Sequence, residues 1–170
     1  MRTLYLLAVL VAGLCWLLAR DVFAEVADQS SVTQLVIIAY AESVHDRAAE
    51  WHVLGKRAAK AGTTTEQLAQ RYVSVFKAAV VGQPRTKWLR AITADCGRPV
   101  GLPTSETWDV AQCQHVRLEA EQFLGGTLPD PCPNAMHWGM RTGIDHERAL
   151  RARWKPATCA QKMANDFWRE

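Results

Sequence analysis

The first 24 residues constrain this chain most, because they decide in which compartment the rest of it folds. A basic start is followed by an almost unbroken apolar run over residues 3–19. Val22 and Ala24 then stand at positions −3 and −1 of a small-residue cleavage site, the pattern of a secretory signal peptide. We therefore predict a signal peptide over residues 1–24 and an exported mature chain over residues 25–170, periplasmic or secreted.

The apolar run lies at the lower edge of the roughly 17–25 residues that span a bilayer, so an uncleaved N-terminal anchor is the alternative. Leu14 precedes Cys15 where a lipobox needs a small residue, which disfavours a lipoprotein. No second run of spanning length follows, so we expect no stable membrane insertion after cleavage. A formal net charge of +3 is too weak to argue for a nucleic-acid partner. The mature length suits a single domain with one hydrophobic core.

Four cysteines remain in the mature chain, and an even number in an exported domain predicts disulfides. They are Cys96, Cys113, Cys132 and Cys159. Of the three pairings we favour Cys96–Cys113 with Cys132–Cys159, because each closes a short local segment. Closing a loop of that size contributes about 3 kcal/mol in the chain-entropy model. Zinc is the alternative, but no two of these cysteines have the close CxxC spacing typical of zinc ligands.

Apolar periodicity predicts a fold that is all-α, or mostly α with a minor hairpin, with long ordered loops and no convincing strand. Residues 31–43 have an apolar face wide enough for a buried helix. We expect Gly62 to end the second helix, and Thr63 to cap the third in a capping box with Glu66. Residues 127–143 lack periodicity and predict a long ordered loop. The predicted helices cover residues 31–43, 47–61, 63–80, 87–94, 108–124 and 145–154.

Glu42 is the candidate catalytic residue, because it stands at the end of the first apolar helix. A carboxyl group there can rest against the core and face a cleft, and partial burial would raise its pKa toward that of a general acid. A solvated glutamate is the alternative. Asp46 and Glu50 follow at i+4 and i+8, but such neighbours lie side by side, whereas a glycosidase pair flanks the scissile bond. We interpret both as solvated or hydrogen-bonding residues.

Aromatic and histidine side chains supply the other candidates. Trp138 lies in the irregular segment beside His137, and an indole face stacks well on a sugar ring. Core packing is the alternative for any tryptophan in a small domain. The histidines are scattered singly, so we predict no metal. A metal-dependent enzyme would need three of four of them to converge with a carboxylate: His45, His115, His137 and His146.

Tyr40-Ala41-Glu42-Ser43, with residues 47–58 after it, resembles the opening of the spore-cortex-type cell wall hydrolases and lytic transglycosylases of the lysozyme-like superfamily. That opening has an Ala-Glu followed by a helix. Residues 120–126 and 130–139 are similar to the closing segment of the same family, in which an Asp-Pro precedes an aromatic-flanked histidine. The resemblance covers roughly residues 35–140.

The resemblance implies a small lysozyme-like helical domain that cleaves peptidoglycan glycan strands, as a lytic transglycosylase or a muramidase-type glycosidase. Glu42 would be the general acid and base. The substrate-binding residues would be Tyr40, Asp46, His137 and Trp138. No cofactor is required, and a partner in an envelope assembly is possible but is not identified by the sequence. The alternative is an exported, non-catalytic envelope-binding protein or inhibitor of lysozyme-like shape. An open groove that joins Glu42 to the tyrosine, the histidine and the tryptophan would distinguish the enzyme from it.

Overall fold

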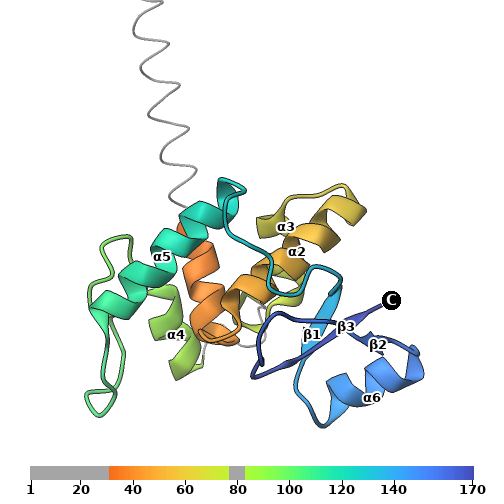
Figure 1. Cartoon of the computed structure of the whole chain (residues 1–170). Helices are drawn as coiled ribbons and strands as arrows, with labels where there is room; N and C mark the ends of the chain where they lie inside the picture. The colour runs from red at the N-terminus through yellow and green to blue at the C-terminus, as the bar shows by residue number, and fades with distance from the viewer. Residues whose placement is uncertain (1–30, 77–82) are drawn as a thin grey trace, which may run out of the picture. The chain divides into compact units, whose positions relative to one another are not determined.

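The computed structural model describes residues 31–76 and 83–170, and the predicted signal peptide lies outside them. Over the described residues the chain is mainly helical, with one small antiparallel sheet and two disulfides. Figure 1 shows the three strands gathered with the last helix beside the C-terminus, while α4 and α5 lie at the other side of the domain. None of the described helices is long and apolar enough to cross a membrane.

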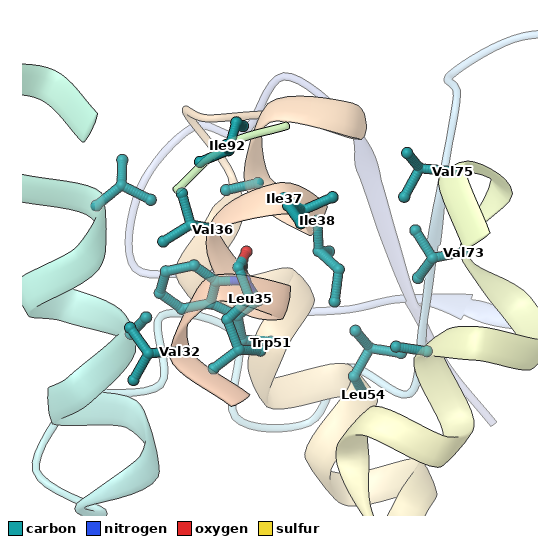
Figure 2. Close-up of a cluster of buried hydrophobic side chains, with 14 of the residues drawn as sticks. Val32, Leu35, Val36, Ile37, Ile38, Trp51, Leu54, Val73, Val75 and Ile92 are labelled. Carbon is teal, nitrogen blue, oxygen red and sulfur yellow. Dashed lines mark hydrogen bonds between the residues drawn. The ribbon is translucent and has the colours of Figure 1, made fainter. Parts of the chain in front are cut away.

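The first described helix covers residues 31–41 and is buried on most sides, as its wide apolar face predicts. Trp51 lies among its side chains, and its indole Nε1 donates a hydrogen bond to the Leu35 carbonyl at 3.1 Å (Figure 2). A bend and turn at residues 42–46 then lead into the next helix. The helix contributes a row of side chains that are at most 6% exposed: Val32, Leu35, Val36, Ile37, Ile38 and Ala39.

Helix α2 (Arg47–Ala61) ends as predicted at Gly62, whose positive φ of 64° suits glycine. Helix α3 (Thr65–Tyr72) begins later than predicted, because Thr64 and Gln67 form the capping box in place of Thr63 and Glu66. The helix also ends well before residue 80, since the buried Val73 is extended and a 3-10 turn, η1 (Ser74–Phe76), follows. Residues 77–82 are outside the described part of the chain.

The remaining helices are α4 (Pro84–Arg90), α5 (Val110–Leu124) and α6 (Ile144–Arg151). Pro84 stands in the first turn of α4, where its missing N–H removes no helical hydrogen bond, so this helix starts before the predicted residue 87. Asp109 caps α5 by accepting a hydrogen bond from the Gln112 N–H at 2.9 Å. Gly143, with a φ of 81°, precedes α6.

The sheet contains β1 (His137–Gly139), β2 (Lys155–Pro156) and β3 (Asp166–Arg169), in the order β1-β3-β2 with antiparallel pairing. The predicted loop over residues 127–143 therefore contains a strand. Strands of two to four residues are too short for a period-two pattern, so alternation in the sequence could not reveal them. They form because the last residues of the chain return to pair with β1.

The disulfides join Cys96 to Cys113 and Cys132 to Cys159, which confirms the predicted pairing. The first joins the loop after α4 to the first turn of α5. The second lies beside a small core between α2 and the sheet. That core includes Ala49, Val53, Cys132, Ala135, Met163 and Phe167, each at most 6% exposed.

Candidate active site

Glu42 lies one residue beyond the helix of residues 31–41 and is exposed to solvent. Its backbone N–H still donates to the Ile38 carbonyl at 2.9 Å, so it closes the last helical turn. The expected partial burial is not observed, because the buried face of the helix ends at Ala39 and the chain then bends at the surface. The Glu42 carboxyl is therefore accessible to a substrate.

Asp46 precedes α2 and is 1% exposed, which corrects the interpretation of this residue as solvated. Its Oδ1 accepts from the Ala164 N–H at 2.9 Å and faces His45 Nδ1 at 2.8 Å. Its Oδ2 accepts from the Asn165 N–H at 2.6 Å. Asp46 is thus a hydrogen-bonding residue that fastens the C-terminal segment to the start of α2, and neither oxygen is open to a substrate.

Glu50 is completely buried, at 0% exposure. Its Oε1 accepts from Asn165 Nδ2 at 3.1 Å, whereas its Oε2 has no hydrogen-bond partner of normal geometry among the described residues. Burial raises the pKa of the Glu50 carboxyl well above its usual range, and the charges of Glu42 and Asp46 raise it further. The Asn165 amide and the nearby Ser43 N–H oppose this shift without reversing it.

We call the carboxyl groups of Glu42, Asp46 and Glu50 the carboxyl cluster. They follow one another at intervals of four residues, from the bend after the first described helix into the first turn of α2. Their mutual electrostatic effect is strong enough to contribute to the raised pKa of Glu50. One member is exposed and two are buried, so the cluster presents a single carboxyl to solvent.

Arg47 fixes the position of this bend. Its guanidinium donates to Glu119 on α5 and to the Val44 carbonyl within the bend. A fork-shaped guanidinium that bonds two partners restricts both of them. The backbone that carries Glu42 is therefore attached to α5 on one side and, through Asp46, to the C-terminal segment on the other.

The burial of Glu50 has a signal in the sequence. Asp46 and Glu50 share their helical face with Ala49, Val53 and Leu54, a spacing typical of a core-facing stripe. A charged residue within such a stripe predicts a buried carboxyl that needs a partner. The partner, Asn165, is 115 residues away along the chain and could not be identified from the spacing.

Tyr40 is partly buried against the main hydrophobic core. Its ring packs on Trp108 with a centroid distance of 5.0 Å, and its buried hydroxyl has no hydrogen-bond partner among residues 31–76 and 83–170. Burial, and then the charge of Asp109, raise the pKa of the Tyr40 hydroxyl, while Arg47 acts in the opposite direction. The Tyr40 hydroxyl therefore does not bond to Glu42.

His137 and Trp138 lie together in another place, a pocket of about 270 Å³ between α2, the sheet and α6, which we call the Trp154 pocket. His137 stacks on Trp154 with ring centroids 3.5 Å apart, and its Nε2 is 3.4 Å from Glu170. Burial and the charge of Arg57 lower the pKa of His137, so its ring is neutral near pH 7. The residues that line the pocket are Arg57, His137, Trp138, Asp145, Arg148, Trp154 and Trp168.

The structure therefore separates the predicted site residues into two groups. Glu42 and Asp46 belong to the carboxyl cluster, and His137 and Trp138 belong to the Trp154 pocket, which Glu42 and Tyr40 do not line. In the part of the chain that the structure describes, no three histidine, cysteine or acidic side chains are arranged to hold a metal ion.

No protein-family model, curated protein or solved structure matches this chain.

Proposed function

We propose that the exported chain cleaves the glycan strands of peptidoglycan, with Glu42 as both general acid and general base. The observation that carries the proposal is the arrangement of the carboxyl cluster. Glu42 is exposed at the end of a buried helix, and the two carboxyl groups beneath it are held inside the protein by four hydrogen bonds from the C-terminal segment and His45. An accessible carboxyl on a fixed backbone is one of the requirements for acid–base catalysis, and this supports the proposal.

The burial of Asp46 favours the lytic transglycosylase route over an inverting hydrolase. An inverting enzyme needs a second carboxylate that activates water on the far side of the sugar. The Asp46 oxygens are occupied by the Ala164 and Asn165 N–H groups and by His45, so Asp46 is poorly placed for that role. A transglycosylase needs only one carboxyl group.

In this route, protonated Glu42 donates its proton to the glycosidic oxygen as the bond from that oxygen to C1 of N-acetylmuramic acid breaks. The positive charge develops on an oxocarbenium-like sugar. The Glu42 carboxylate then removes the proton of the C6 hydroxyl, whose oxygen bonds to C1 and forms a 1,6-anhydro sugar. Glu42 ends protonated and ready for the next cycle, and no cofactor is consumed.

The test is digestion of purified peptidoglycan by residues 25–170, with mass spectrometry of the products. Anhydro-muropeptides that disappear in Glu42→Gln, and persist in Glu121→Gln, support the transglycosylase. Glu121 is a suitable control because it is exposed on α5, where it pairs with Arg117 at i,i+4. Reducing muropeptides would instead indicate a muramidase-type glycosidase. Circular dichroism of both variants would show that each is folded.

The second candidate is an exported, non-catalytic envelope-binding protein or inhibitor. The observation in its favour is that Tyr40 packs against Trp108 and that His137 and Trp138 line a separate pocket, so these residues do not share a groove with Glu42. Co-sedimentation with insoluble peptidoglycan, combined with the absence of any soluble product from the wild type, would support this alternative.

A further inference from the structure

We propose that the Trp154 pocket binds a sugar ring that carries a free carboxylate, such as an N-acetylmuramic acid residue without its stem peptide, at a place away from the bond that is cut. The inference rests on the proposed function for its choice of sugar. The pocket itself is defined by side chains that the catalytic proposal does not use, and it can be tested by binding alone.

The pocket has a preorganised aromatic wall. The rings of His137 and Trp154 are stacked with an interplanar angle of 8°. The ring centroid of Trp168 is 6.5 Å from that of Trp154. His137 and Trp168 are directly opposite each other in β1 and β3, so their side chains share one face of the sheet. Indole faces pack well on the apolar face of a sugar ring, and rings already fixed in place lose little entropy when a ligand binds.

Two arginines from different elements complete the pocket. Arg57 extends from α2, and Arg148 extends from α6. The Arg148 guanidinium is 3.9 Å from the Asp145 carboxylate, beyond hydrogen-bond distance, and its side chain is 65% exposed. Its N–H donors are therefore available to a ligand. The Arg57 charge reaches the same space, because it lowers the pKa of the His137 ring in addition to the effect of burial.

Charged side chains of both signs lie at the pocket. Arg57, Arg148 and Asp145 line it, and Glu170, which is near His137, is paired with Lys60 at 2.5 Å. The Arg148 guanidinium, beyond hydrogen-bond distance from Asp145, is the group that meets the ligand. A planar carboxylate matches the fork of a guanidinium and can accept two parallel hydrogen bonds from it.

The size of the pocket suits a single sugar ring. Its volume of about 270 Å³ is just below the range of about 300–1,000 Å³ for sites that enclose drug-sized molecules. N-acetylmuramic acid and N-acetylglucosamine provide a matched pair of probes, because they differ only by the lactyl ether that bears the carboxylate. Muramyl dipeptide distinguishes a lactyl carboxylate from one on the stem peptide.

The experiment is titration of residues 25–170 with each sugar, followed by saturation-transfer NMR and calorimetry. We expect N-acetylmuramic acid to bind at least about tenfold more tightly than N-acetylglucosamine, a difference of about 1.4 kcal/mol, and also more tightly than muramyl dipeptide, whose lactyl carboxyl is an amide. Arg148→Gln should abolish this preference. Arg151→Gln should retain it, because Arg151 is on the same helix, is exposed and pairs with Glu147 instead of lining the pocket.

Equal affinities for the sugars, absence of binding, or a preference that survives Arg148→Gln would overturn the proposal. Glu42→Gln should bind the sugar acid as the wild type does. This separates the two proposals, because loss of peptidoglycan cleavage with intact binding concerns Glu42 alone, whereas loss of binding with intact cleavage concerns the Trp154 pocket alone.

Discussion

Glu50 places a carboxyl group inside the protein with one hydrogen bond of normal geometry for its two oxygens. An ionised carboxylate in this position would lack most of the solvation that water gives it. Retaining a proton avoids that cost, and it also leaves Asp46 without a second buried negative charge beside it. Asp46 beside Glu50 accepts hydrogen bonds from two N–H groups of the C-terminal segment and faces His45 Nδ1.

This protonation makes stability depend on pH at Glu50. The folded state holds the proton above the reference pKa of 4.5, while the unfolded state loses it. The contribution of the protonated Glu50 to the free energy of unfolding is therefore complete below about pH 4.5. It is lost as the pH rises toward the raised pKa, by up to about 1.4 kcal/mol for each pH unit. We expect urea unfolding to show that the stability of Glu50→Gln relative to wild type increases as the pH rises above about 4.5, while the stability of Glu121→Gln follows that of wild type with pH. Parallel curves for Glu50→Gln would contradict the assignment.

At the scale of elements, β1 and α6 are held together by the close approach of Gly139 and Asp145. A Cβ added to Gly139 would lie 2.6 Å from the Asp145 Cβ, a distance that side chains cannot adopt. The Asp145 carboxylate also reaches the Met140 N–H at 3.4 Å. Glycine is therefore required here for close packing, and the approach of the two elements shapes one end of the Trp154 pocket.

Gly139→Ala should consequently separate β1 from α6 and destabilise the protein by about 1–3 kcal/mol, the usual cost of overpacking. Thermal unfolding followed by circular dichroism measures the effect. Gly97→Ala is the matched control, since its added Cβ would meet Asp95 only at ordinary contact distances of 3.5 Å and more. Similar melting temperatures for both variants would show that Asp145 yields easily.

For the whole molecule, the C-terminal segment supports both proposed sites. Residues 164 and 165 bond the carboxyl cluster, and β3 in the same segment supplies Trp168 to the Trp154 pocket. Arg141 anchors the segment further through the carbonyls of Met163 and Ala164. The Cys132–Cys159 disulfide lies just before this segment, whereas Cys96–Cys113 lies at the start of α5.

Replacement of both cysteines of either disulfide by alanine should lower the free energy of unfolding by about 3–4 kcal/mol in the chain-entropy model. The two losses should differ in consequence. Without Cys132–Cys159, binding of N-acetylmuramic acid should weaken even well below the melting temperature, because the segment that carries Trp168 is released. Without Cys96–Cys113, binding should remain. Equal effects on binding would show that the C-terminal segment does not depend on its own disulfide.

The sequence by itself determined the features that depend on local order. Apolar periodicity located the buried helix that ends near Glu42, Gly62 marked the end of α2, and short separations indicated both disulfides. These predictions are confirmed because each of them involves residues that are close along the chain. The predicted end of the third helix failed for the opposite reason, since burial of Val73 in the core outweighed the helical pattern that continues beyond it.

Only the tertiary structure decided what surrounds the functional candidates. Burial of Asp46 and Glu50 depends on Asn165, and the position of His137 depends on a strand of four residues at the end of the chain. Such contacts leave no periodic signal, because each joins a few residues across a long separation. A carboxyl group acquires its pKa, and a pocket its charge, only when these distant segments meet.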